Sequence, residues 1–266
     1  MEEVRNSVAV QAAEMLIDEH SRRVQFRPFA SEFKIADTQG AYDVQREYVR
    51  LQMNDRRAGA KGYKVGLTSL RMQAMCRIDS PIAGVVLEDR VRQTGVRIAR
   101  SDYGRLGLEF EIAVRLARDL GRSGGGPVTI PDVSEAIDAV CPAIEIVDDR
   151  GCDYRTLDVL SLIADNSWNA GIVLGAFERV WPDLAEIEGV VSVDGAENDR
   201  GLGRDVLGHP YQSVAWLAGH LADAGAGLRA GDIVMTGNLV TTKFPTAPCS
   251  YQFELKGLGS VGLSID

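Results

Sequence analysis

The sequence predicts an α+β protein in which a small helical N-terminal region, residues 1–60, precedes a β-rich domain, residues 61–266. Two observations carry this prediction. Apolar residues recur at helical spacing through the first part of the chain. From Lys61 onward, glycines become frequent and apolar residues gather in short runs that are typical of strands. A chain of 266 residues is long enough for one large domain, or for a domain with an appendage.

Two helices are expected in the N-terminal region, with a break at Pro28 between them. In each of them, residues spaced three or four positions apart share one face, as an amphipathic helix requires. The residues that define these faces are Val8, Ala12, Met15, Leu16 and Glu19 in the first helix, and Ala41, Val44, Tyr48, Val49 and Gln52 in the second.

In the β-rich domain, nine short apolar runs predict strands, many of them in mixed or antiparallel pairs. The runs are 63–67, 82–87, 108–116, 143–147, 171–174, 190–193, 232–236, 251–255 and 261–265. Two helices interrupt them. The first follows Thr129, a candidate N-cap, carries Pro131 in its first turn and is expected to run to about Val140. The second is expected over Gln212–Ala224, with its apolar residues on one face.

The composition of the chain argues against several classes of partner. A formal net charge of -9 disfavours nucleic acid or an anionic membrane as the main partner. The chain starts without a basic segment and a following apolar run, so no signal peptide is expected, and no apolar stretch is long enough to span a bilayer. The four cysteines lack CxxC spacing and are typical of reduced thiols. A cytoplasmic location is therefore predicted.

The segment LGLEFEIAV, residues 106–114, is the most informative part of the chain. As a strand, it places its apolar side chains on one face and both Glu109 and Glu111 on the other. Such a pair of acids is most often a solvated strand face. A third acid, Glu145, lies inside the apolar run AIEIV, where an unpaired buried carboxylate would cost several kcal/mol.

A divalent cation would satisfy all three carboxylates at once, so a metal site is the alternative to a solvated face. All-oxygen sites suit Mg²⁺ or Mn²⁺, and one of these ions is the predicted cofactor, held by Glu109, Glu111 and Glu145. Zinc is disfavoured because the three histidines of the chain form no pair at ligand spacing.

A series of motifs follows in order over some two hundred residues. The motifs are GYKVGLTS (62–69), IDSPIAGVV (78–86), LEFEIAV (108–114), PAIEIVDDR (142–150), ADNS (164–167), GIVLG (171–175), HPYQSVAWLAGHLA (209–222), GDIVMTG (231–237) and GLGSVGLSI (257–265). Together they resemble the 2-keto-4-pentenoate hydratase and 4-oxalocrotonate decarboxylase group, within the fumarylacetoacetate hydrolase superfamily. The resemblance covers nearly the whole chain. It implies a mixed β-barrel-like roll, the C-terminal-like fold of that superfamily, with a helical N-terminal part.

The resemblance also implies roles for residues around the end of the substrate that carries the carboxylate and the oxo group. Glu109, Glu111 and Glu145 resemble the metal ligands of the group. Lys64 resembles the lysine that faces the carboxylate and oxo group of the substrate, and it lies in an apolar, glycine-flanked segment. A lysine at an arbitrary position would be a surface residue.

Further residues are expected to act on or bind the rest of the substrate. Asp79 resembles an acid proposed for proton transfer, although an Asp before Ser-Pro also starts turns. Ser167 resembles a serine near the reacting carbons. Leu67, Trp168 and Thr236, which lie in or beside the matching motifs, are expected to bind substrate.

The activity that the resemblance implies is that of a lyase. It is a metal-dependent hydratase that adds water to a 2-hydroxy-2,4-dienoate of the 2-keto-4-pentenoate type, giving a 4-hydroxy-2-oxo acid in aromatic-compound catabolism. The cation would act as a Lewis acid on the 2-oxo group. The resemblance further implies a homo-oligomer, with a pathway enzyme as a potential partner in a complex.

Two segments depart from the pattern of the group and leave the substrate open. Trp168 and Asn169 stand where many relatives carry small residues. The segment GNLVTTKFP, residues 237–245, brings in Lys243 and Phe244. Both segments are expected to line the pocket and to affect specificity.

The sequence leaves three alternatives to hydration open, two of them activities and one a non-catalytic role. A 4-oxalocrotonate-type decarboxylase needs the same electron-accepting site. A hydrolase of acylpyruvates is disfavoured, because that branch uses a histidine–glutamate pair and no such histidine precedes the Glu109–Glu111 motif. A non-catalytic partner subunit is disfavoured because the three glutamates and Lys64 are intact.

Overall fold

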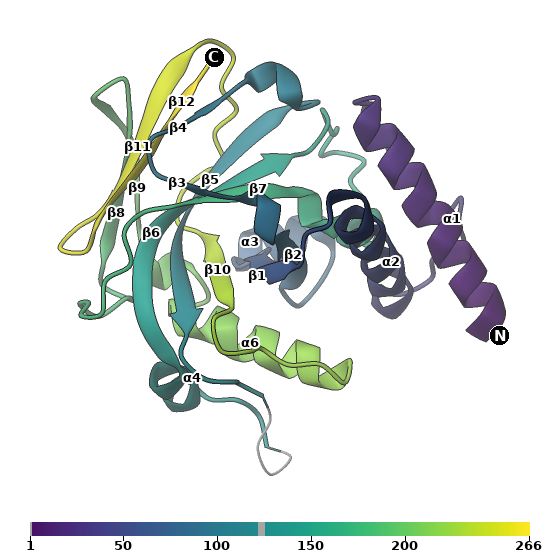
Figure 1. Cartoon of the computed structure of the whole chain (residues 1–266), viewed down its shortest axis with the longest axis horizontal. Coiled ribbons are helices and arrows are strands. Elements are labelled where there is room, and N and C mark those ends of the chain that lie inside the picture. The colour runs from purple at the N-terminus through teal and green to yellow at the C-terminus, as the bar shows by residue number, and fades with distance from the viewer. Residues whose placement is uncertain (1, 122–125) are drawn as a thin grey trace.

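The chain builds two β-sheets that share one hydrophobic core, as the computed structural model shows for residues 2–121 and 126–266 (Figure 1). One sheet has seven strands in the order β2-β1-β10-β5-β6-β7-β3, and the other has five in the order β4-β12-β11-β8-β9. The strands of the larger sheet are β1 (Ala60–Gly66), β2 (Ile82–Leu87), β3 (Val91–Gln93), β5 (Leu106–Leu116), β6 (Ile137–Asp148), β7 (Asn169–Leu174) and β10 (Ile233–Asn238). Those of the smaller sheet are β4 (Val96–Ile98), β8 (Glu188–Val193), β9 (Ala196–Leu202), β11 (Cys249–Leu255) and β12 (Gly259–Ile265).

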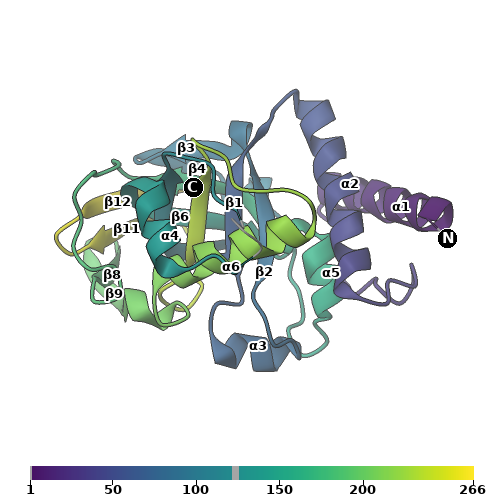
Figure 2. The ribbon, with the colours of Figure 1, turned by 90° about the horizontal axis from the view of Figure 1, so that it is seen from below.

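Helices lie at one side of the sheets, and in the view from below others cross in front of the strands (Figure 2). The two long N-terminal helices, α1 and α2, pack against each other, as the helical spacing of the first sixty residues predicts. The helices are α1 (Glu2–Ser21), α2 (Thr38–Arg56), α3 (Leu70–Cys76), α4 (Ile130–Ala136), α5 (Val159–Ala164) and α6 (Pro210–Asp223).

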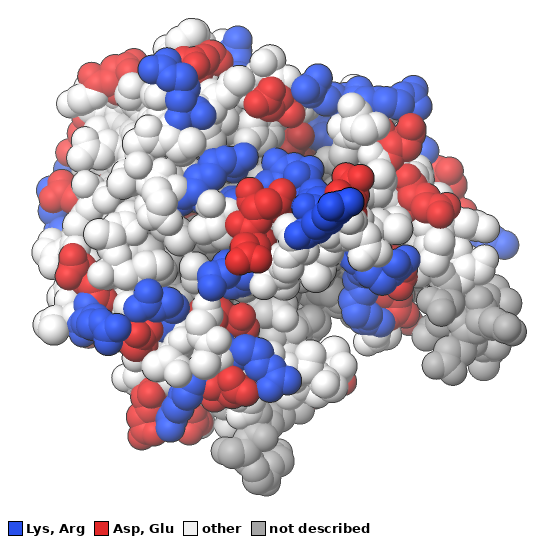
Figure 3. All heavy atoms as spheres, viewed as in Figure 1, with Lys and Arg blue, Asp and Glu red and all other residues white. Residues whose placement is uncertain are grey.

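The surface carries charges of both signs. Acidic and basic side chains are interspersed on the face seen in Figure 3. Many exposed arginines pair with carboxylates, as Arg155 does with Asp153 and Arg204 with Glu186. None of the helices that the structure describes is both long enough and apolar enough to cross a membrane.

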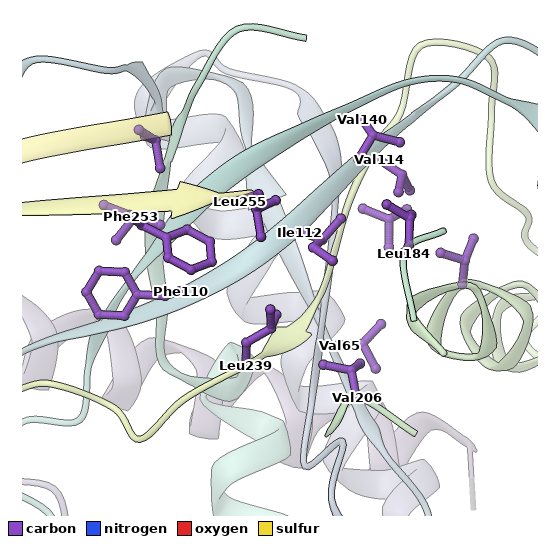
Figure 4. Packing of buried hydrophobic residues seen from close by; sticks show 14 of the residues in the cluster. Val65, Phe110, Ile112, Val114, Val140, Leu184, Val206, Leu239, Phe253 and Leu255 are labelled. Carbon is purple, nitrogen blue, oxygen red and sulfur yellow. The ribbon is translucent and has the colours of Figure 1, made fainter. Parts of the chain in front are cut away.

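Neither sheet closes on itself among the described residues, so the expected barrel-like roll is confirmed only in part. The core is closed instead by packing one sheet against the other. The ring of Phe110 in β5 lies 5.7 Å from that of Phe253 in β11, and Ile112 and Leu255 extend the contact (Figure 4). Because the apolar faces cover each other, the edge strands need not pair to bury them. The α+β class is confirmed.

The helix after Thr129 is shorter than expected. The Thr129 hydroxyl accepts a hydrogen bond from the Asp132 N–H, which confirms the N-cap prediction. The helix nevertheless ends at Ala136 rather than near Val140, because Ile137 begins β6 and pairs with Leu116 of β5. An apolar run such as this one fits a buried strand as well as a helix, and the pairing with β5 decides between them.

The N-terminal helices rest on the end of the larger sheet. A second hydrophobic cluster joins α1, α2 and α5 with Ile82, Val147 and Trp168 from the β-rich part of the chain. Figure 2 shows α1, α2 and α5 together on one side. Since the sequence predicts that Trp168 binds substrate, the helical region lies close to the expected site.

Candidate metal centre

Strands β5 and β6 bring three glutamates together. Glu109 of β5 lies directly opposite Glu145 of β6, and Glu111 follows two residues later on the same face of β5. One carboxylate oxygen from each glutamate lies within 4.8 Å of the other two. The opposite face of β5 carries Phe110 and Ile112 into the core (Figure 4). The alternation predicted from the sequence is therefore confirmed.

Each glutamate accepts one hydrogen bond from a different part of the chain. The bonds run from the Gly237 N–H to Glu111 Oε2 (2.7 Å), from the Asn169 amide to Glu145 Oε1 (2.8 Å) and from the Thr242 hydroxyl to Glu109 Oε1 (2.8 Å). The other oxygen of Glu111, Oε1, is buried and has no hydrogen-bond partner among the described residues. A buried carboxylate oxygen without a donor is costly, so this oxygen fits a cation ligand.

Lys64 places a positive charge beside the cluster. Its Nζ lies 3.3 Å from Glu145 Oε2, and its side chain is buried. Burial alone would lower the pKa of the ammonium group, but the carboxylates of Glu145, Glu109 and Glu111 outweigh burial and raise this pKa. Lys64 therefore stays protonated.

The acids of the cluster hold their protons more tightly than free carboxylic acids do. Burial raises the pKa of Glu145 to about 7, against the attraction of Lys64. Burial, followed by repulsion from Glu145 and Glu109, raises the pKa of Glu111 well above its usual range. When all three carboxylates are ionised, they and the ammonium group carry two excess negative charges, which a divalent cation would neutralise. With oxygen ligands alone, Mg²⁺ and Mn²⁺ suit the site.

The cluster opens onto a cavity of about 430 Å³. Besides Glu109, five residues predicted from the sequence line it, namely Lys64, Leu67, Ser167, Trp168 and Phe244. A Cβ atom at Gly66 would lie 3.2 Å from both Lys64 Nζ and Ser167 Oγ, so the glycine leaves open the space between these two groups. The cavity is of a size that accommodates small-molecule ligands.

Outside the glutamate cluster, four residues that the sequence predicts at the site do not line this cavity, and one of them, Asn169, instead donates its amide to Glu145. Thr236 is buried in β10, and its hydroxyl donates to the Ile112 carbonyl (2.9 Å). Asp79 is exposed in the loop before β2. Lys243 forms an ion pair with Asp199 of β9, which corrects the expectation that it faces the pocket. Its neighbour Phe244 does line the cavity.

The loop that carries Ser167 has a strained backbone. Asn166, Ser167 and Trp168 have φ angles of 49°, 51° and 59°, in the left-handed region that residues with side chains seldom adopt. The Asn166 amide accepts from the Val85 N–H (2.7 Å) and donates to the Val85 carbonyl (2.9 Å), which fixes the loop to β2. Strain of this kind persists where the surroundings impose it, and it gathers at functional sites.

The sequence did not reveal what anchors this loop. Asp165, which precedes it, accepts a hydrogen bond from Arg150 (2.8 Å) and lies 2.6 Å from the His20 ring nitrogen Nε2. Arg150 also donates to Glu19 of α1 (3.0 Å). The signal in the sequence is the run of charges DDR, residues 148–150, directly after the Glu145 strand. This buried group ties the N-terminal helix to the loop of Ser167.

Asn169 is expected to support the binding of a cation through Glu145. Asn169→Ala removes the donor to Glu145 Oε1 and should weaken Mg²⁺ binding about 10- to 100-fold, as loss of a hydrogen bond behind a metal ligand does. Titration calorimetry with Mg²⁺ measures the change. Asn54→Ala, at an exposed position of α2, is the control and should bind like wild type. Equal affinity in both variants would mean that Asn169 orients no ligand.

Similarity to known proteins agrees with this geometry. Residues 71–261 match the family described as fumarylacetoacetate (FAA) hydrolase C-terminal. The chain is 32% identical over 257 residues to the 2-oxo-hept-4-ene-1,7-dioate hydratase of Escherichia coli, covering 94% of each chain. It is 31% identical over 236 residues to 2-keto-4-pentenoate hydratase 1 of Dechloromonas aromatica, covering 88% of each.

A solved structure extends the similarity over nearly the full length. It is the 4-oxalocrotonate decarboxylase from Pseudomonas putida G7 complexed with magnesium and adipate, which superposes with a TM-score of 0.90 at 28% sequence identity. The superposition covers 97% of both chains. The open-sheeted α+β fold, the match over residues 71–261 and the similarity of full-length relatives lead to one conclusion: the chain belongs to the fumarylacetoacetate hydrolase family.

Proposed function

We propose that the chain is a divalent-metal-dependent lyase that hydrates a 2-hydroxy-2,4-dienoate to a 4-hydroxy-2-oxo acid in aromatic-compound catabolism. The observation that carries the proposal is the cluster of Lys64 and three glutamates, two of them buried and one half-buried, beside a cavity of small-molecule size. Glu109, Glu111 and Glu145 would hold Mg²⁺ or Mn²⁺. When bound, the cation supplies Lewis-acid stabilisation of negative charge on the substrate's 2-oxo oxygen. Relatives named as hydratases support the assignment.

Lys64 would bind the anionic head of the substrate. It is buried and protonated, so its charge acts at low dielectric on a carboxylate that enters the cavity. The same charge stabilises the negative charge that develops on the 2-oxo oxygen during the reaction. Leu67 and Trp168, which also line the cavity, would contact the carbon chain.

Hydration requires two proton transfers to carbon and one water. The enol hydroxyl loses its proton while C5 gains one, which gives a conjugated 2-oxo-3-enoate. The oxygen of water then adds at C4, and a proton adds at C3. Ser167 lies across Gly66 from Lys64, and we place its hydroxyl near these carbons. Asp79, in the exposed loop before β2, stays a prediction for proton transfer.

The second candidate is a 4-oxalocrotonate-type decarboxylase, favoured by the similarity to the decarboxylase structure at a TM-score of 0.90. When CO₂ leaves such an acid, the 2-oxo group accepts the electron pair of the broken bond. The cationic surroundings that favour hydration therefore serve decarboxylation equally well.

An acylpyruvate hydrolase and a non-catalytic subunit have less support. The hydrolase would need a histidine beside the cluster, and among the described residues that line the cavity there is none. A non-catalytic partner subunit would have no need of three clustered glutamates beside a buried Lys64.

Product analysis tests the proposal and separates the candidates. The purified protein is incubated with Mg²⁺ and either 2-hydroxypenta-2,4-dienoate or 4-oxalocrotonate, while NMR follows the products and a CO₂ assay runs in parallel. We expect the 4-hydroxy-2-oxo acid without CO₂. Release of CO₂ without hydration would make the protein a decarboxylase. No product from either acid, together with no calorimetric signal for Mg²⁺, would leave the partner subunit.

The proposal also covers the location, the oligomeric state and the domain organisation of the protein. We expect a cytoplasmic homo-oligomer, free or in complex with a pathway enzyme, in which residues 1–60 form a helical region attached to a catalytic domain of residues 61–266. Light scattering after size exclusion measures the oligomer, and a mass that corresponds to a monomer would contradict this part.

A further inference from the structure

The cavity beside the glutamate cluster is charged at two separate places. Among the described residues that line it, Lys64 and Glu109 lie at the metal end, and the other charged side chain is that of Arg71. Arg71 lies in the first turn of α3, which follows the N-cap Ser69. It is exposed to solvent, so it lies at the mouth of the cavity rather than at its floor.

Arg71 differs from most exposed arginines of the chain. Arg155 and Arg204, for example, each pair with a carboxylate. Among the side chains of residues 7–121 and 126–266, no carboxylate lies at ion-pair distance from Arg71, and no group there accepts a hydrogen bond from it. A guanidinium offers five N–H donors in a planar fork that fits a carboxylate. At the mouth of a cavity, this unused fork is available to a ligand.

The walls between the two charged places are mostly apolar. They suit the carbon chain of a ligand and offer no second charge between its two ends. The apolar side chains of the lining include those of Leu67, Met72, Met75, Val147, Leu162 and Phe244.

We infer that Arg71 binds a second carboxylate at the far end of the substrate, and that the preferred substrate is dicarboxylic. The first carboxylate lies beside Lys64, the diene crosses the apolar walls, and the terminal carboxylate meets the guanidinium of Arg71. As a statement about turnover, this inference rests on the proposed function. As a statement about binding, it stands on Arg71 and the cavity alone.

Binding of unreactive saturated acids tests the inference independently of catalysis. Mg²⁺-loaded wild type, Arg71→Ala and Arg155→Ala are titrated with 2-oxopentanoate and with 2-oxoheptanedioate. Arg155→Ala is the matched control, because it removes an exposed positive charge that does not line the cavity. We expect Arg71→Ala to bind the diacid about 10- to 100-fold more weakly than wild type, since a charge-assisted hydrogen bond is lost. The monoacid should bind all three proteins alike.

Kinetics with the corresponding dienoates give a second readout. Arg71 does not touch the reacting carbons, so Arg71→Ala should raise KM for the seven-carbon diacid with little change in kcat, and should leave the five-carbon monoacid unaffected. Arg71→Lys keeps the charge without the planar fork and should lie between wild type and Arg71→Ala for the diacid.

The outcomes separate the inference from the proposed function. Equal losses for both acids would mean that Arg71 only steers anions toward the cavity, which overturns the inference. A wild type that binds the monoacid as tightly as the diacid also overturns it. Binding of the diacid that depends on Arg71, without turnover of either dienoate, would support the inference and refute the hydratase.

Discussion

Glu111→Gln is expected to lower kcat/KM by about 10³-fold or more. Glutamine keeps the size of the side chain, and its amide oxygen can still accept from the Gly237 N–H. The change removes the negative charge of an oxygen that faces Glu109 and Glu145. A Lewis acid contributes several kcal/mol to a transition state that carries oxygen charge. Each tenfold change in rate corresponds to about 1.36 kcal/mol of activation free energy. Loss of the several kcal/mol that the cation contributes therefore lowers the rate by at least three factors of ten.

The same substitution should leave the metal-free protein at least as stable as wild type. Glu111 is fully buried, its Oε1 has no partner among the described residues, and its pKa is raised by burial and by the neighbouring acids. A neutral amide removes the cost of burying that charge and can donate to Glu145 or Glu109. Loss of activity without loss of stability distinguishes a ligand from a structural residue.

The pH dependence of metal-free stability follows from the sign of these shifts. Folding raises the pKa of Glu145 from 4.5 to about 7, and that of Glu111 also rises. The folded protein therefore holds more protons than the unfolded chain in this range. The stability linked to these protons is fully present below about pH 4.5 and is lost as the pH rises through about 7. A cation binds the deprotonated carboxylates, so Mg²⁺ should restore stability over the same range.

Thermal unfolding with Mg²⁺ or with a chelator measures these effects. At a Mg²⁺ concentration of 100 times the dissociation constant, wild type should gain about 2.7 kcal/mol and Glu111→Gln should gain none. In chelator, the Tm of the variant should fall less steeply with pH than that of wild type. Glu135→Gln, at an exposed glutamate paired with Arg118, is the control and should behave like wild type. A Glu111→Gln variant that still responds to Mg²⁺ would exclude Glu111 as a ligand.

The glutamate cluster could be predicted because its main features follow from residues that are close together in the sequence. Alternation along β5 puts Glu109 and Glu111 on one face without any tertiary information. Glu145 is conspicuous as a lone acid in an apolar run. That Glu145 lies opposite Glu109 depends on the register of two strands separated by a long connection, and the sequence alone does not set that register.

Other features depend on long-range contacts that leave little trace in the sequence. Strand β9 is polar, and it is a strand because it pairs with β8 at the sheet edge. Strands β3 and β4 have three residues each, too few for a periodic pattern. Thr236 lies in a matching motif, yet its hydroxyl is engaged by the Ile112 carbonyl of a neighbouring strand. The open sheets follow from how two apolar faces meet, which residue spacing does not encode.

The largest effect on stability is expected at Arg150. This residue is almost fully buried and donates to Asp165 (2.8 Å) and to Glu19 (3.0 Å). Burial alone would raise the pKa of Asp165, but His20 and Arg150 outweigh burial and lower it, so Asp165 stays charged in the folded protein. Arg150→Met leaves two buried carboxylates without this cation and should cost about 3–5 kcal/mol. The whole free energy of unfolding of a natural globular protein is about 5–15 kcal/mol.

Arg150→Met is expected to lower catalytic activity as well as the free energy of unfolding. Asp165 directly precedes the left-handed residues Asn166, Ser167 and Trp168, whose strain persists because the anchor holds the loop. In Arg150→Met, kcat should therefore fall further than the folded fraction does. Adding Asp165→Asn removes one stranded charge and should recover part of the lost free energy of unfolding, which a double-mutant cycle measures.

Urea unfolding of the single and double variants tests this coupling. Arg155→Ala, at a solvent-exposed arginine of the same segment, should change the free energy of unfolding by no more than about 0.5 kcal/mol. If Arg150→Met costs as little as Arg155→Ala, the buried ion pairs do not hold the Ser167 loop. If it costs several kcal/mol and the Asp165→Asn change does not recover any of it, Arg150 acts through its packing rather than through Asp165. Only coupling between the two substitutions would show that the N-terminal helix stabilises the candidate active-site loop through this charge cluster.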